Sequence, residues 1–257
     1  MVSTKEIKEA FWSMKHYKAP GPDGLHSLDA MVSTEEIKEA LWSMKPYKAP
    51  EPDGLHAGFF QRFWLIFWDS MRKEVEKVFI ERKVPKYLNN AHIILIPKIQ
   101  GPETIGNYRP INLCNLVYKI ITKIIIARIK PNLDTLVSPY QTTFIPGRRG
   151  VDNAIIVQEL IHTIRRAKGN RGVMAIRIDL EKAYDRIKWS FIREMLTLFN
   201  FPENLIKLIM CCVTSVSTSL LFNGGRLDLF LPLRGIRQGD PFSPYLFILC
   251  MELLGHS

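Results

Sequence analysis

Apolar and polar positions along the chain follow two different periods. Apolar residues spaced three or four apart predict helices at 33–44, 58–82, 116–130, 152–168, 190–199 and from 243 to the end of the chain. Strict alternation or short β-branched runs predict strands at 92–97, 173–180, 216–222 and 227–231. The last two strands flank Asn223 and Gly224, a strong signal for a hairpin turn. This order of elements predicts an α+β fold.

The chain opens with a tandem repeat. Residues 1–26 and 31–56 align at an offset of 30 and differ only at Lys5/Glu35, Phe11/Leu41, His16/Pro46 and Gly21/Glu51. Repeat architectures need about three or more diverged units. Two near-identical copies instead indicate a recent duplication, so we expect residues 1–30 to be dispensable. Each copy starts with a capping box, at Ser3 and Ser33.

Asp179 lies at the end of the predicted strand 173–180. The alternation places Ile176, Ile178 and Leu180 on one face and Asp179 on the other. A carboxylate at a strand end is a rigid mount for a divalent cation that shares its oxygen ligands with substrate phosphates. The same pattern is equally consistent with Asp179 only capping a helix or stabilising a turn.

Two further features suit contact with an anionic ligand. Gln238 and Gly239 form a polar turn before the last helix, and a glycine lets a backbone, a base or a sugar approach closely. Cations stand beside prolines or a glycine at Lys98, Arg109, Arg148 and Arg149, where rigid turns favour phosphate binding. The same sequence patterns also occur in turns that bind no ligand and in solvated loops.

Composition narrows the class of protein. The 257 residues include 47% hydrophobic ones and carry a formal net charge of +10, which excludes disorder throughout and favours a polyanionic partner. No apolar run is long enough to span a membrane, and the charged start is unlike a signal peptide. We therefore expect an intracellular protein, in the nucleus or cytoplasm and not secreted, with no membrane partner.

The four cysteines lack metal-site spacing and are expected to be reduced and buried. Six large aromatic rings within 59–68 favour core packing over base stacking.

Six sequence blocks in order resemble the reverse transcriptase of non-LTR, LINE-type retrotransposons, especially plant elements. The resemblance covers residues 31–257. Its blocks are Lys-Ala-Pro-x-Pro-Asp-Gly at Lys48, Leu95-Ile96-Pro97-Lys98, Asn107-Tyr108-Arg109-Pro110-Ile111, Gln141-x-x-Phe144-Ile145-Pro146-Gly147-Arg148, and the stretches 179–189 and 237–247. Group II intron maturases and telomerases fit these blocks less well.

The resemblance implies a right-hand polymerase architecture and its partners. Residues 31–172 would form a fingers-like region, and residues 173–257 a partial palm with an antiparallel sheet backed by helices. The family reaction is template-directed addition of dNTPs to a DNA primer on an RNA template, with two Mg²⁺ ions.

Residue roles follow from the same resemblance. Asp179, with the carbonyl of Leu180, corresponds to the catalytic metal ligand. Lys98 and Arg109 resemble the residues that bind the triphosphate, and Tyr184 resembles the aromatic gate beneath the deoxyribose. Gln238 and Gly239 match the segment beside the incoming nucleotide and the template. Arg148 and Arg149 are candidate nucleic-acid contacts, whereas Asp185 is expected to be structural.

The chain also departs from the family pattern. It holds no Tyr/Phe-x-Asp-Asp and no thumb before it ends at Ser257, and a single Asp179 cannot hold two dications about 4 Å apart. We therefore expect a fragment without meaningful polymerase activity. Two alternatives are a non-catalytic nucleic-acid-binding remnant and an unfolded pseudogene product. Glu51 stands where the first copy of the repeat keeps Gly21, and strain is expected there if the position needs a positive φ.

Overall fold

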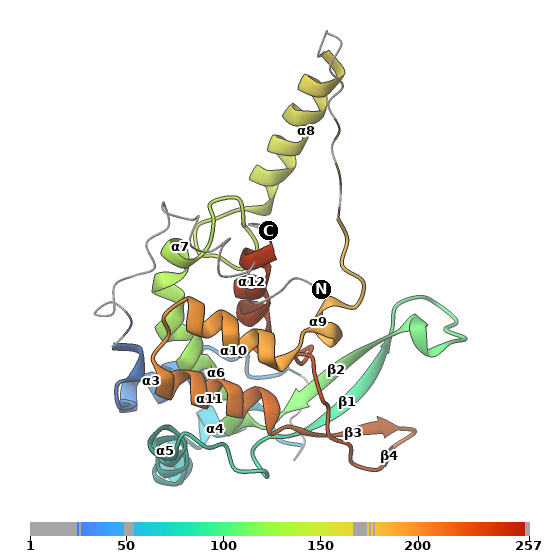
Figure 1. Cartoon of the computed structure of the whole chain (residues 1–257). Helices are drawn as coiled ribbons and strands as arrows, with labels where there is room; N and C mark the ends of the chain where they lie inside the picture. Colours follow the sequence, from blue (N-terminus) through green and yellow to red (C-terminus); the bar gives the residue numbers. More distant parts are fainter. Residues whose placement is uncertain are drawn as a thin grey trace.

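The computed structural model of the chain describes residues 27–48, 54–166 and 178–254, together with Leu25, Met174 and Ile176. Residues 1–24, with the predicted capping box at Ser3, and Glu51 lie outside the described residues. The helices are η1 (Ser27–Asp29), α3 (Thr34–Trp42), α4 (Ala57–Arg62), α5 (Trp64–Glu81), η2 (Ile105–Asn107), α6 (Leu116–Ile129), η3 (Lys130–Asn132), α7 (Leu133–Leu136), α8 (Gly150–Arg166), α9 (Ala183–Arg186), α10 (Trp189–Leu198), α11 (Glu203–Thr214) and α12 (Ser243–Leu254). The strands are β1 (Asn90–Pro97), β2 (Tyr108–Cys114), β3 (Ser217–Phe222) and β4 (Gly225–Arg226). Figure 1 shows the helices gathered on one side of a small sheet. The predicted α+β class is confirmed.

The sheet has the strand order β2-β1-β3-β4 and is mixed. β1 pairs with β2 in antiparallel register, with Ile96 opposite Arg109, but it pairs with β3 in parallel, with His92 opposite Ser219. The expected antiparallel sheet is therefore only partly present: β1–β2 and β3–β4 pair antiparallel, whereas β1–β3 pair in parallel. Parallel neighbours need a long crossover, and here the chain between β1 and β3 supplies helices α6 to α11.

The β3–β4 hairpin turns where the sequence predicts it. Asn223 and Gly224 both have positive φ, 48° and 77°, as a type I′ turn requires. The predicted strand 227–231 is wrong, because regular pairing in β4 stops at Arg226. Beyond Arg226, the Leu227 amide donates to the Leu220 carbonyl (2.9 Å), and an isolated bridge joins Thr218 to Phe230.

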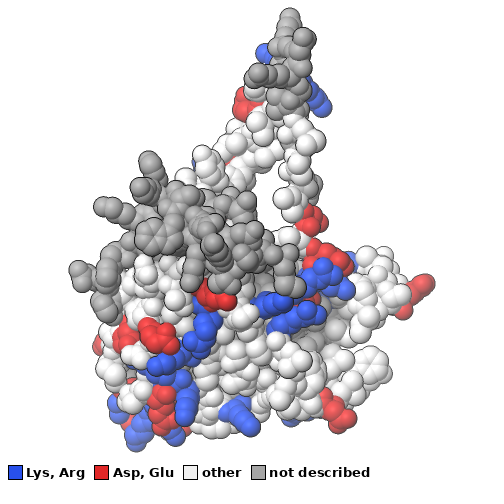
Figure 2. Space-filling model, in the orientation of Figure 1, with Lys and Arg blue, Asp and Glu red and all other residues white. Residues whose placement is uncertain are grey.

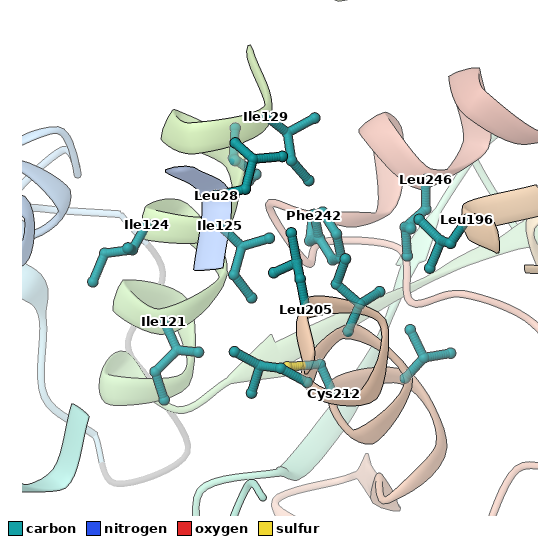
Figure 3. Packing of buried hydrophobic residues seen from close by; sticks show 14 of the residues in the cluster. Leu28, Ile121, Ile124, Ile125, Ile129, Leu196, Leu205, Cys212, Phe242 and Leu246 are labelled. Atoms are coloured by element: carbon teal, nitrogen blue, oxygen red, sulfur yellow. The ribbon is translucent and has the colours of Figure 1, made fainter. Parts of the chain in front are cut away.

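Helix α6 lies at the centre of the core. Nine of its residues are buried, including Ile121, Ile124, Ile125 and Ile129. Figure 3 shows Ile125 and Ile129 on the side of α6 that faces Leu205 of α11 and Phe242 from the segment before α12, whereas Ile124 points to the opposite side. The helix predicted at 116–130 is confirmed. α3 and α5 both pack against it, so little of its surface remains for water.

The start of α3 has the predicted cap and an ion pair to α6. The hydroxyl of Ser33 accepts a hydrogen bond from the Glu36 amide (3.2 Å), and the Glu36 carboxylate accepts one from the Ser33 amide (2.9 Å). Arg128 of α6 donates to both oxygens of Glu36, at 2.6 and 2.8 Å. Burial alone would raise the pKa of Glu36, but its bonds to Arg128 and Ser33 lower it below the usual value. These contacts hold α3 against α6.

The aromatic segment 58–82 folds as two helices, α4 and α5, rather than the single one predicted. Phe60, Trp64 and Trp68 pack against the core, which confirms the prediction of core packing for these three rings. Phe59 and Phe63 are more exposed and contact each other, with ring centroids 5.0 Å apart.

None of the four cysteines forms a disulfide. Cys114, Cys212 and Cys250 are buried, as predicted, and Cys211 is half-buried. Burial raises the pKa of Cys250 to about 12, so this thiol remains protonated and unreactive at neutral pH.

One part of the chain projects from this packed body. We call α8 and the described residues Met174, Ile176 and 178–180 the arm, and the remaining described residues the body (Figure 1). The predicted helix at α8 is confirmed, although none of its residues is buried. The predicted strand 173–180 is not formed by its described residues, and Met174 and Ile178 are 78% and 81% exposed. A strand needs a paired neighbour, and none pairs with these residues.

Charge is mixed on the face drawn in Figure 2. Basic and acidic side chains lie next to one another on the body, whereas the described part of the arm is mostly uncharged. No helix among the described residues is both long and apolar enough to cross a membrane.

Candidate active site

The β1–β2 hairpin carries Lys98 and Arg109. Lys98 follows β1, and its backbone amide donates a hydrogen bond to the Asn107 carbonyl (2.8 Å). Its ammonium group donates to the Gly106 carbonyl (3.0 Å). Arg109 lies on β2 opposite Ile96, and both cationic side chains are exposed. The hairpin thus presents two positive charges on a backbone fixed by the ladder.

A buried polar cluster lies beneath the Gln238–Gly239 turn. Arg237 pairs with Asp240 (3.0 Å) and lies over the ring of Tyr118, with 4.2 Å from the guanidinium carbon to the ring centroid. The Tyr118 hydroxyl donates to Asp240 (2.6 Å), and Arg237 also donates to the Asn89 side chain (2.9 Å). Burial raises the pKa of Tyr118 well above its usual value, which keeps this hydroxyl a donor. Because the ion pair joins residues on both sides of the turn, it fixes the turn's two ends.

The turn itself packs against β2. The Gln238 carbonyl accepts hydrogen bonds from the backbone amide (2.7 Å) and the side-chain amide (3.2 Å) of Asn112. Gly239 has φ +102°, and a Cβ there would lie 2.7 Å from the Asn112 carbonyl oxygen. The sequence suggested that another group approaches Gly239 closely, and in the structure that group is the backbone of Asn112. Only glycine fits this position without displacing β2.

Tyr184 of α9 lies beside the same turn. The Tyr184 carbonyl accepts from the Ile236 amide (2.8 Å), and Trp189 donates its indole hydrogen to the Gly235 carbonyl (2.8 Å). The Tyr184 ring stacks on Phe247 of α12, with centroids 4.9 Å apart. Half-burial raises the pKa of its hydroxyl. These bonds join the 184–189 stretch to the segment that leads into Gln238.

A pocket of about 150 Å³ opens among these elements. Its lining includes Pro110 and Asn112 of β2, Asp185 of α9, and Gln238 and Asp240 of the turn. The structure thus brings β2, Tyr184 and the Gln238–Gly239 turn together, although they are far apart in the sequence.

Asp179 and Leu180 are not brought into this assembly by a strand. Both are exposed in the arm, just before α9. In the described part of the chain, no three His, Cys, Asp or Glu side chains are grouped so that they could hold a metal ion. The described residues therefore do not fit the site for two divalent ions that the family resemblance implies.

Arg148 and Arg149 differ in their surroundings. Arg148 donates to the carbonyls of Gln141 (2.8 Å) and Val137 (3.2 Å) and pairs with Asp134 (3.1 Å). Its guanidinium thus holds the loop before α8 together. Arg149 is 80% exposed and forms only a long ion pair, 3.5 Å, with Asp152. Of the two, Arg149 is the one that a polyanion can reach.

Sequence reasoning missed the roles of Arg237, Asp240 and Tyr118. Arg237 and Asp240 were visible as opposite charges three positions apart on either side of a glycine turn. That spacing alone did not show their burial, since it is also common at solvated turns. Nothing in the sequence connected Tyr118 to them.

Comparison with known proteins identifies the family. The family model described as "Reverse transcriptase (RNA-dependent DNA polymerase)" matches residues 96–257, which is more than half of the chain. The chain belongs to the reverse transcriptase family. This match and the relatives described next confirm the predicted resemblance to reverse transcriptases of non-LTR retrotransposons.

Three relatives of this reverse transcriptase chain are proteins of transposable elements. It is 30% identical over 98% of its length to a protein named "Transposon TX1 uncharacterized 149 kDa protein" from Xenopus laevis. It is 28% identical over 66% of its length to the "Retrovirus-related Pol polyprotein from type-2 retrotransposable element R2DM" of Drosophila melanogaster. An R2 Pol polyprotein of Bradysia coprophila is 29% identical over 74% of the chain. The reverse transcriptase chain spans 16 to 22% of the length of these relatives.

Proposed function

We propose that this chain forms the nucleotide-positioning part of an RNA-directed DNA polymerase of a non-LTR retrotransposon. Its substrate would be a dNTP paired to an RNA template at the end of a DNA primer. Residues 31–172 would act as fingers and residues 173–257 as part of a palm, although β1 and β3 share one sheet across that boundary. Such a protein works where its template RNA and primer DNA meet, in the nucleus or the cytoplasm.

The roles proposed for its residues follow the site geometry. Lys98 and Arg109 bind the triphosphate, because exposed cations on a fixed hairpin suit its negative charge. Tyr184 lies under the sugar, where its ring excludes a ribose 2′-hydroxyl. Gln238 and Gly239 contact the template base pair, and Arg149 contacts the nucleic-acid backbone.

One observation carries this proposal. The Asn112–Gln238 and Ile236–Tyr184 hydrogen bonds hold three separate sequence blocks in one place. The blocks are the strand that carries Arg109, the α9 turn that carries Tyr184, and the Gln238–Gly239 turn. A nucleotide site needs this convergence, since base, sugar and phosphates must be contacted together.

We propose Asp179, with the Leu180 carbonyl, as one ligand of the Mg²⁺ that this chemistry uses. The other acidic ligands are not among the described residues. We accordingly expect the chain to bind nucleotide and nucleic acid without extending a primer.

Nucleotide binding tests the proposal directly. With an RNA template and a DNA primer present, dTTP should bind more tightly than UTP, as measured by isothermal titration opposite a template adenine. Arg109→Ala should weaken both ligands about tenfold, and Tyr184→Val should remove the preference for dTTP. A folded chain that binds neither nucleotide would refute the proposed site.

Primer extension tests the role of Asp179. We expect no extension by the wild-type chain or by Asp179→Asn. Extension that Asp179→Asn abolishes would show that the remaining metal ligands are present and that the expected inactivity is wrong. Extension that survives the substitution would refute Asp179 as the metal ligand.

A further inference from the structure

The sheet ends in an exposed edge at β4. β4 is the last strand in the order β2-β1-β3-β4, at one end of the sheet (Figure 1). Every residue from 222 to 231 is exposed. The edge of a sheet presents backbone N–H and C=O groups that can pair with a strand of another chain. We call residues 225–229 the edge segment.

The backbone of the edge segment has a defined direction. The Leu227 amide donates a hydrogen bond to the Leu220 carbonyl (2.9 Å), so this N–H points toward β3. In an antiparallel ladder, the backbone groups of successive residues point to alternate sides of the strand. The N–H and C=O groups of Arg226 and Asp228 therefore lie on the outer edge, where a further strand could pair with them.

Arg226 and Asp228 carry opposite charges on the same face of the edge segment, because they are two positions apart. The Arg226 side chain is oriented by a hydrogen bond from its Nε to the Ser219 hydroxyl (2.9 Å), which leaves the two terminal nitrogens of the guanidinium to bind a carboxylate. Asp228 is exposed and forms no ion pair with another residue that the structure describes. The edge thus presents one cation and one anion side by side.

Two copies of the edge segment fit each other in antiparallel pairing. If Leu227 lies opposite its own counterpart, Arg226 of each copy lies opposite Asp228 of the other, and two ion pairs form at once. The same register lets these residues exchange backbone hydrogen bonds, since their N–H and C=O groups face outward. Parallel pairing in register would instead place like charges opposite each other. The charge pattern therefore favours a second copy of this chain, related by a two-fold axis.

Apolar side chains support the same pairing. Leu227 is 50% exposed, and its side chain lies on the opposite face of the edge segment from Arg226 and Asp228. In the antiparallel register, the two Leu227 side chains would form a pair without backbone hydrogen bonds, the pair type in which side chains approach most closely. Burial of this exposed apolar surface favours association.

We propose that this chain forms a homodimer by antiparallel pairing of the edge segments of two copies, which joins their two sheets into one. The dimer does not depend on the proposed nucleotide site, because β2, the strand that carries Arg109, lies at the other end of the sheet. Since one strand from each copy makes a small interface, the dimer should dissociate on dilution.

Sedimentation velocity of the purified chain at several protein concentrations tests the proposal. We expect a monomer–dimer equilibrium for the wild type. Asp228→Arg places like charges opposite each other in both pairs and should raise the dimer Kd by at least about tenfold. Arg226→Asp should weaken self-association in the same way. An equimolar mixture of these two variants should dimerise again, because opposite charges then face each other. Circular dichroism of each variant checks that its fold is retained.

The matched control is Glu103→Arg, which makes the same change of charge at an exposed position between β1 and β2. It should leave the dimer Kd unchanged. Equal weakening by Glu103→Arg and Asp228→Arg would mean that only net charge matters, and would overturn the proposal. A wild type that is monomeric at every concentration would also overturn it and would leave this edge to a strand of a different protein. Association that persists unchanged in Asp228→Arg would place the interface elsewhere and equally refute it.

Discussion

The body and the arm use the same sequence pattern with opposite outcomes. α6 and α8 are both helices with apolar residues at helical spacing, yet nine residues of α6 are buried and none of α8 is. The difference lies in what surrounds them: α3 and α5 pack on α6, whereas α8 projects from the body (Figure 1). A periodic pattern thus specifies a helix and its apolar face, but burial depends on a partner elsewhere in the chain.

The sharpest way to test this contrast is to break one ion pair in each region. Arg237→Leu leaves Asp240 buried without its cation, and we expect a loss of about 3–5 kcal/mol in the free energy of unfolding. Arg149→Leu removes an exposed ion pair at the base of the arm, with Asp152 of α8, and should change the free energy of unfolding by less than about 0.5 kcal/mol. Urea denaturation followed by circular dichroism measures both.

A double variant identifies the cause. Arg237→Leu combined with Asp240→Asn should recover part of the stability lost by Arg237→Leu alone, since no unpaired charge remains. If the double variant is as unstable as the single one, lost packing rather than a buried charge is responsible.

Truncating one apolar side chain in each helix gives the next largest difference. Ile125→Ala in α6 removes fully buried methylene groups and should cost about 3 kcal/mol. Ile156→Ala in α8 removes an exposed side chain and should have an effect below about 0.5 kcal/mol. Comparable losses from the two substitutions in thermal unfolding would show that α8 is packed in solution, and the contrast between body and arm would then fail.

The smallest expected effect comes from acid. Because the folded-state pKa of Glu36 lies below its unfolded value, the Glu36–Arg128 pair contributes its full stability above the unfolded pKa, about 4.3. This contribution disappears as the pH falls through the lower, folded-state pKa. We expect a loss of about 1 kcal/mol or less between about pH 6 and pH 3. Glu36→Gln should remove that part of the pH dependence; an unchanged profile would assign it to other groups.

Local elements of the fold could be predicted from the sequence, but the pairing of strands that are far apart in the sequence could not. The capping box at Ser33, the helix at α6 and the turn at Asn223–Gly224 each depend on a few adjacent residues. The parallel pairing of β1 with β3 has no local signal, because no turn connects the two strands. The described residues of the strand expected at 173–180 do not form one for the same reason: alternation defines two faces and does not supply a partner.

The candidate site was only partly predictable. The family resemblance selected Tyr184, Gln238 and Gly239, and the structure brings them together. The backbone approach of Asn112 to Gly239 depends on how β2 packs, which residue types do not reveal.

The parallel pairing of β1 with β3 also has a consequence for biosynthesis. His92 contacts Ser219, 127 residues further along the chain, through a hydrogen bond between their side chains (2.8 Å). At a translation rate of about 5–20 residues per second, β1 leaves the ribosome roughly 6 to 25 s before the strand it pairs with. During that interval, one edge of the β1–β2 hairpin has no neighbour, and the nascent chain depends on chaperones or rapid helix packing to avoid pairing with another molecule.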